Sequence, residues 1–75
     1  MQWRDHIEED PKVMLGKPVF KGTRLTVEHI LEELGNGVPE HELLENHPRL
    51  RPEHILAAFQ YAAAVLKLEH LVATD

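Results

Sequence analysis

Residues 16–27 read Gly-Lys-Pro-Val-Phe-Lys-Gly-Thr-Arg-Leu-Thr-Val, and this block marks a change from an extended pattern to a helical one. Val19 and Phe20 form a short apolar pair, which is typical of a small edge strand, and Gly22 after them could supply either a positive φ in a turn or a β-bulge. Thr26 is a favourable N-cap for the helical pattern that follows. The block therefore predicts a junction between a hairpin and a helix.

The residues before this block are also expected to be extended. A second apolar run, Val13-Met14-Leu15, ends at Gly16. Short apolar runs separated by glycine and proline are typical of small strands joined by turns. We therefore expect an N-terminal β-hairpin arm over residues 1–25.

Three helices are predicted over residues 26–75. The first carries apolar residues at i, i+3, i+4 and i+7, and it ends at Gly35-Asn36-Gly37, residues that tolerate left-handed backbone. The second begins with Pro39 at its first position and ends before Pro48, because the residue before a proline disfavours helical backbone. The third begins at Pro52 and extends to about residue 72. The fold class is therefore mainly α, in a single domain with a helix-turn-helix arrangement.

The third helix is long for so small a chain, and residues 61–66 are apolar on nearly every side. Such a helix requires burial on every side, which the first two helices cannot supply. A frayed alanine-rich helix is the alternative. We expect a second chain, in a homodimer or a complex, to cover it. The predicted interface residues are Phe59, Ala62, Ala63, Leu66, Leu68 and Val72.

Length and composition limit the class of protein. Seventy-five residues allow one small core, and chains of this size usually need a disulfide, a metal or a partner subunit for stability. The absence of cysteine excludes disulfides and indicates a reducing compartment. No segment has the ~20 apolar residues of a membrane span, and the N-terminus does not resemble a signal peptide. We therefore expect a cytoplasmic protein without membrane contact.

The net charge of −5 is unevenly distributed, with −3 over residues 1–10, +4 over 11–27 and −6 over 28–75. A local basic segment can contact a phosphate backbone although the remaining chain is acidic, but ordinary solvated lysines give the same pattern. Arg24 could instead anchor the turn by pairing with Asp10 or Glu28. The candidate nucleic-acid-binding residues are Lys17, Lys21, Arg24, Arg49 and Arg51.

The sequence gives little support for recognition of DNA bases by the third helix, or for catalysis. The early positions of the third helix carry Glu53 and His54, without Arg, Lys or Asn. The chain has no serine or cysteine nucleophile. The six histidines form no HExxH motif and no i, i+4 pair, so we interpret them as surface residues. The sequence predicts a protein that is not an enzyme, with no catalytic, cofactor-binding or metal-binding residues.

The motifs themselves resemble a known family. Its pattern is matched by Ile7 to Pro11, by the Gly16–Val27 block, by Asn46-His47-Pro48-Arg49-Leu50 and by Pro52-Glu53-His54-Ile55. The chain resembles, over about residues 5–65, the domain-of-unknown-function family numbered 433, which is often described as VapB-type antitoxin-like. Val38 and Arg51 stand where similar sequences commonly place Ser or Thr before a helix-starting proline, so both helices are expected to lack a side-chain cap.

The resemblance implies a β-hairpin arm followed by a homeodomain-like helix-turn-helix bundle. It also implies an antitoxin that binds and neutralises a PIN-like nuclease toxin. Such an antitoxin would bind operator DNA and thereby regulate its own expression. A helix-turn-helix DNA-binding regulator without a toxin partner is the alternative function.

Overall fold

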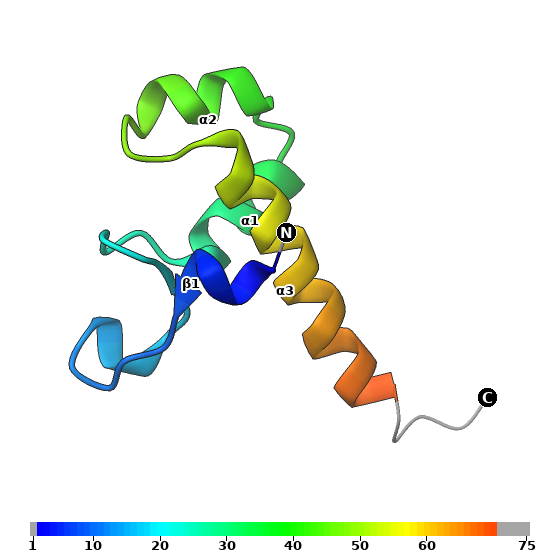
Figure 1. The fold of residues 1–75 in the computed structure, drawn as a ribbon. Helices are drawn as coiled ribbons and strands as arrows, with labels where there is room; N and C mark the ends of the chain where they lie inside the picture. Colours follow the sequence, from blue (N-terminus) through cyan, green and yellow to red (C-terminus); the bar gives the residue numbers. More distant parts are fainter. Residues whose placement is uncertain (1, 71–75) are drawn as a thin grey trace.

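The structure is a computed structural model that describes residues 2–70 and the side chains of residues 2–68. Within these residues, the chain folds into three α-helices and one two-stranded antiparallel hairpin (Figure 1). The mainly helical prediction is therefore confirmed. In chain order, the elements are η1 (Trp3–Asp5), β1 (Ile7–Glu8), η2 (Met14–Gly16), β2 (Val19–Phe20), α1 (Val27–Gly35), α2 (Glu40–Asn46) and α3 (Pro52–His70).

The first strand of the hairpin lies earlier than the sequence predicted. β1 pairs with β2 so that Ile7 lies opposite Phe20 and Glu8 opposite Val19. The expected strand over residues 13–15 is wrong, because Met14 and Leu15 have left-handed backbone, with φ of 48° and 58°.

A turn at Asp10 accounts for this difference. The Asp10 side chain accepts a hydrogen bond from the backbone N–H of Lys12 at 2.9 Å, and its carbonyl accepts one from Val13 at 2.8 Å. Such turns compete with extended backbone. The chain then bends through η2, and Leu15 lies 93% exposed to solvent.

The Gly16–Val27 block forms a tight turn that leads directly into α1. The Thr23 backbone N–H and hydroxyl both donate to the Phe20 carbonyl, at 3.0 and 2.7 Å. Gly22 lies in this turn with φ of 78°, as predicted. The chain returns alongside β2, where Val19 forms an antiparallel bridge with Thr26. The Thr26 hydroxyl accepts from the His29 N–H at 3.1 Å, which confirms the predicted N-cap.

The other helix ends follow the sequence signals closely. α1 ends at Gly35, and Gly37 follows with φ of 90°. Pro39 is the N-cap of α2 rather than its first residue, and α3 begins at Pro52.

The segment predicted as an arm packs into the body. Ile7, Val19 and Phe20 are buried, and Phe20 lies against the His54 ring of α3 at a centroid distance of 5.3 Å. Trp3 contacts Tyr61 edge to face at 4.9 Å, so the N-terminus covers one side of α3. The other buried core residues are Val27, Ile30, Leu43, Leu50, Ile55, Ala57 and Ala58.

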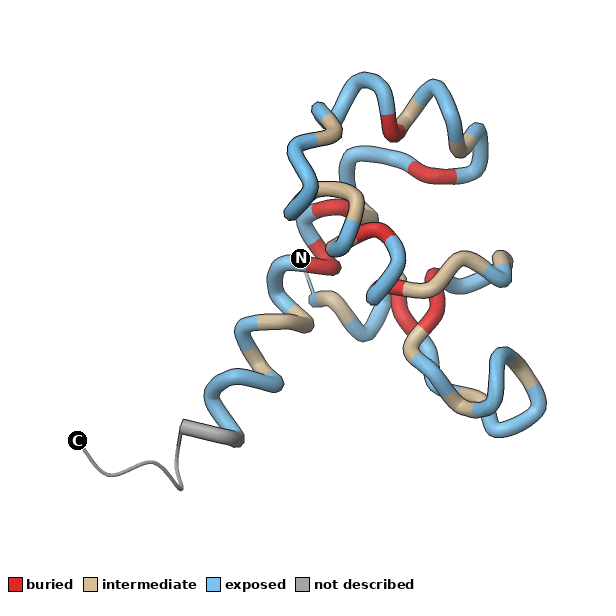
Figure 2. Tube along the Cα trace, turned by 180° about the vertical axis from the view of Figure 1, so that it is seen from behind, coloured by how far each residue is buried: buried red, intermediate tan, exposed pale blue. Residues whose placement is uncertain are grey.

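The second half of α3 extends beyond this body (Figures 1 and 2). Over the part of α3 whose side chains the structure describes, residues 52–68, the buried residues lie between positions 55 and 58. Among the described helices, none combines the length and the apolar character that crossing a membrane requires.

Candidate functional site

An apolar groove lies between α1 and the projecting half of α3. It has a volume of about 570 Å³, and Leu31, Val65 and Leu66 are among the apolar residues that line it. Glu28 and Glu32, one helical turn apart on α1, contribute carboxylates to its wall. The remaining lining residues are Pro18, Val27, Tyr61 and Ala62. The groove is therefore suited to an apolar segment with basic flanks.

A second apolar surface lies on the outward side of α3. Leu56, Phe59 and Leu66 are 56%, 50% and 62% exposed, and Ala63 between them is also exposed. Their positions follow the alternating three- and four-residue spacing of a coiled-coil seam. We call these four residues the outer stripe. It faces away from the core.

The predicted interface residues divide between these two surfaces. Phe59 and Ala63 lie on the outer stripe, Ala62 lies in the groove, and Leu66 belongs to both. Leu68 is 68% exposed. Val72 lies outside the described residues. No contact in the structure tests whether another chain covers these residues, so the interface stays a prediction.

The five predicted basic residues differ in their contacts. Lys17 Nζ lies 3.5 Å from Glu28 Oε1 of α1. Arg49 donates from Nη1 to the Gly22 carbonyl at 3.1 Å, which connects the loop before α3 to the turn that follows β2. Arg24 and Arg49 line a common hollow of about 430 Å³. Lys21 and Arg51 are exposed.

Arg24 does not form the ion pair that the sequence suggested. Among the residues the structure describes, it pairs with neither Asp10 nor Glu28, and Glu28 pairs with Lys17 instead. Asp10 accepts from the backbone of Lys12, as described above. This expectation is therefore wrong.

The start of α3 has a cap that the sequence did not reveal. The backbone N–H of Arg51 donates to Nδ1 of His54 at 2.8 Å, as in one half of a capping box. Burial and then the nearby His6 lower the pKa of His54, Arg51 acts in the same direction, and Glu53 opposes them. The neutral ring is the form that accepts this bond. His54 therefore supplies one half of a capping box at a helix start where the sequence offers no Ser or Thr N-cap.

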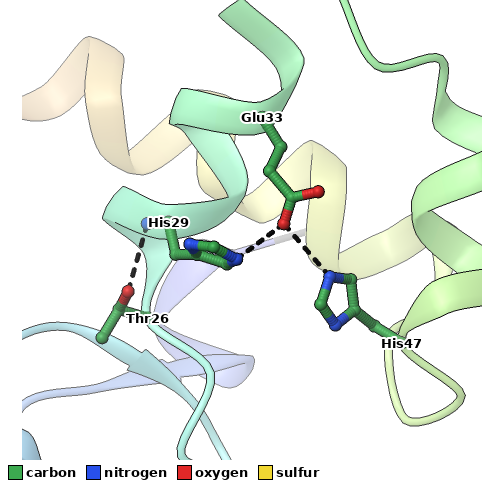
Figure 3. A network of polar contacts seen from close by, with 4 residues as sticks. All are labelled: Thr26, His29, Glu33 and His47. Carbon is green, nitrogen blue, oxygen red and sulfur yellow. Dashed lines mark hydrogen bonds and ion pairs between the residues drawn. The ribbon is translucent and has the colours of Figure 1, made fainter. Parts of the chain in front are cut away.

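The structure also brings together three side chains that sequence reasoning did not connect (Figure 3). Glu33 Oε1 lies 2.6 Å from Nε2 of His29, one turn earlier on α1, and 3.2 Å from Nε2 of His47, which follows α2. The i, i+4 spacing of His29 and Glu33 was a usable signal. The third member could not be found without the fold, because His47 is fourteen residues from Glu33.

Both a protein family model and a crystal structure match this chain. The family model "Protein of unknown function (DUF433)" matches residues 7–62. This chain belongs to the DUF433 family. A crystal structure of a DUF433 member protein from Anabaena variabilis resembles it with a TM-score of 0.78 and 28% sequence identity, over 95% of this chain and 71% of that chain. Among curated proteins, no sequence matches the chain.

Proposed function

We propose that this DUF433 protein is an antitoxin-like binding protein that recognises a partner protein through α3 and silences it. The observation that carries the proposal is the projecting half of α3, where apolar side chains are exposed beside a groove with acidic residues in its wall. A helix that is apolar on several sides and projects from its own core is suited to burial against another chain.

The charge of the groove indicates the chemistry of the partner. Residues 28–75 carry a net charge of −6, and Glu28 and Glu32 are exposed in the groove wall. An apolar helix flanked by Lys or Arg would bury its apolar residues on Leu31 and Val65 and place its charges near both carboxylates. We propose a basic PIN-like nuclease as this partner, since the family resemblance implies a nuclease of that class.

The outer stripe gives the same protein a means of self-association. Its spacing allows α3 helices of two copies to pack along Leu56, Phe59, Ala63 and Leu66. In the proposal, the stripe forms the homodimer and the groove binds the nuclease. The two surfaces adjoin at Leu66, so dimer formation and nuclease binding are coupled there.

Co-expression with the protein encoded by the adjacent gene tests the nuclease-binding function. We expect the two proteins to co-elute on size-exclusion chromatography, and the chain to rescue growth of cells that express the nuclease. Val65→Glu should weaken the complex because it places a charge on the apolar lining of the groove. Glu32→Lys should also weaken it, because it replaces a negative charge of the groove lining with a positive one. Lys67→Glu is the matched control, since Lys67 is exposed on α3 and does not line the groove.

The dimer requires a separate measurement on the chain alone. Phe59→Lys should reduce the mass measured by sedimentation equilibrium from dimer to monomer and leave the circular dichroism spectrum unchanged. A wild-type chain that is monomeric at high concentration contradicts the dimer. Co-elution that survives both groove variants contradicts the groove assignment.

A homeodomain-like helix-turn-helix regulator is the second candidate, and the convergence of Arg24 and Arg49 on one hollow favours it. Two guanidinium groups on the rim of one hollow could bind phosphates of operator DNA, with Arg51 and Lys21 as further contacts. Binding to the chain's own promoter should then weaken steeply with salt, and Arg24→Ala should lower the slope of log K against log salt by about 1. Salt-insensitive binding, or none, contradicts it.

A further inference from the structure

The cluster of His29, Glu33 and His47 joins two parts of the fold through one carboxylate. His29 and Glu33 lie on the same face of α1, and His47 is the C-cap of α2. Their nearest ligand atoms all lie within 4.8 Å of one another, and the two imidazole rings are nearly perpendicular, at 88° (Figure 3). Both histidines direct Nε2 toward the same oxygen, Oε1 of Glu33.

From this geometry we infer that the cluster is a binding site for a first-row transition-metal dication, with Zn²⁺ as the representative ion. Two imidazole nitrogens and one carboxylate oxygen are a donor set that Zn²⁺ uses with a fourth position open to water. Mg²⁺ and Ca²⁺ prefer oxygen donors and are a poor match for two nitrogens. This site is one that sequence reasoning did not predict.

The distances require only a small opening of the cluster. Tetrahedral Zn²⁺ with bonds of about 2.0–2.2 Å holds its ligand atoms about 3.3–3.6 Å apart. The His47–Glu33 distance of 3.2 Å already approaches this value, whereas His29 and Glu33 must separate from 2.6 Å. The His29 side chain is 54% exposed and can move outward, while Glu33 and His47 are 23% and 24% exposed and better enclosed.

The backbone already holds the three residues in place. The Thr26 cap orders the first turn of α1 at His29, with a hydrogen bond of 3.1 Å. The His47 backbone N–H donates to the Leu43 carbonyl at 2.9 Å, and Pro48 follows it directly. Ligands positioned before the metal arrives lose less conformational freedom on binding, which favours affinity.

The position of the site indicates a structural role for the ion. α2 buries only one of its residues, Leu43, so few core contacts anchor it to the body. A metal bound by Glu33 and His47 would connect α1 to the loop that leads from α2 into α3. Small chains without disulfides commonly gain stability from such a link. None of the three cluster residues lines the groove, so this inference does not depend on the proposed function.

Titration of the untagged full-length chain with ZnCl2 tests the site. Isothermal titration calorimetry should give one ion per chain. At a free concentration about 100-fold above the dissociation constant, the thermal midpoint should rise by roughly 10–20 °C. MgCl2 and CaCl2 at the same concentrations should leave the midpoint unchanged. Absence of binding, or an equal shift with Mg²⁺, overturns the inference.

Substitutions then assign the ligands. Glu33→Gln and His47→Gln should each weaken Zn²⁺ binding at least about tenfold. Removal of a residue that only orients a metal ligand already lowers metal affinity by about that factor, and these two residues would be ligands themselves. His41→Gln is the matched control, since His41 is exposed on α2 outside the cluster and should bind as wild type. His54→Gln tests the other close histidine pair, whose rings lie 5.5 Å apart. Loss of binding in either of these two variants, with binding retained in the cluster variants, overturns the assignment.

A measurement on the unmodified chain keeps the test independent of variant folding. Addition of Zn²⁺ should shift the imidazole NMR signals of His29 and His47, and leave those of His6 and His41 in place. Shifts spread over all these histidines would show adventitious surface binding and contradict the site.

Discussion

Phe20 and Phe59 are the two phenylalanines of the chain, and they lie in two regions that differ in how far their apolar side chains are buried. Phe20 of β2 is fully buried between the hairpin and α3, whereas Phe59 of α3 is 50% exposed on the outer stripe. Burial of an aromatic side chain stabilises the fold, while an exposed apolar stripe marks a contact with another molecule. If the outer stripe binds another chain as proposed, stability and binding depend on different residues, and the two properties should be separable by substitution.

The largest expected effect comes from replacing the buried member of this pair. Phe20→Ala removes a side chain with no exposed surface and should cost about 3–5 kcal/mol in the free energy of unfolding. A 75-residue chain has roughly 4–11 kcal/mol in total, so the variant should be largely unfolded on mild warming. Urea denaturation followed by circular dichroism measures the loss.

Phe59→Ala is the matched control for the body. At dilution, where any dimer is dissociated, it should lower the free energy of unfolding by only about 1–2 kcal/mol, because half of the Phe59 surface is already exposed and alanine favours the helix. At high protein concentration it should remove any concentration dependence of the thermal midpoint. Equal losses for the two variants at dilution would contradict the division between core and binding surface.

Local sequence signals predicted much of the body correctly. Thr26, Gly22 and Pro52 act through their own backbone and immediate neighbours, so each could be assigned without knowledge of the fold. The predicted strand at residues 13–15 failed because its apolar side chains resemble a strand, whereas the Asp10 turn decides the backbone. Its replacement, Ile7 paired with Phe20, joins residues thirteen positions apart.

The candidate sites show the same limit. The apolar character of α3 was visible in the sequence, because helical spacing alone places Phe59 and Leu66 on one side. The approach of His47 to Glu33 was not visible, because it depends on the angle between α1 and α2. Arg49 was predicted as a phosphate contact, and its bond to the Gly22 carbonyl likewise required the fold.

A second pair of residues, Gly22 and Gly35, tests whether the turn that follows β2 contributes to the stability of the fold. Gly22 has φ of 78°, and an added Cβ there would meet no atom within 4 Å, so only backbone strain opposes substitution. Gly22→Val should therefore lower the free energy of unfolding by about 1–3 kcal/mol. Gly35→Ala is the control, since Gly35 also has open space and lacks positive φ. It should be neutral or slightly stabilising, and thermal midpoints that fall equally in both variants would contradict the strain argument.

The smallest expected effect concerns pH and the first turn of α3. The pKa of His54 is lowered in the fold, chiefly by burial, so the folded state favours the neutral ring. Its contribution is therefore fully present above the unfolded pKa of about 6.5 and is lost as pH falls through the folded value. Protonation also removes the Nδ1 acceptor for the Arg51 N–H. Between pH 7 and 5, the wild-type thermal midpoint should fall more than that of His54→Gln.

Glutamine at position 54 can accept the Arg51 N–H in a capping box but cannot take up a proton in this range. The difference between the two pH profiles isolates His54, because every other titrating group is the same in both chains. Parallel profiles for wild type and His54→Gln would mean that the neutral ring does not stabilise α3. The first half of α3 would then be held by buried residues such as Phe20, Ile55, Ala57 and Ala58, without a contribution from the cap.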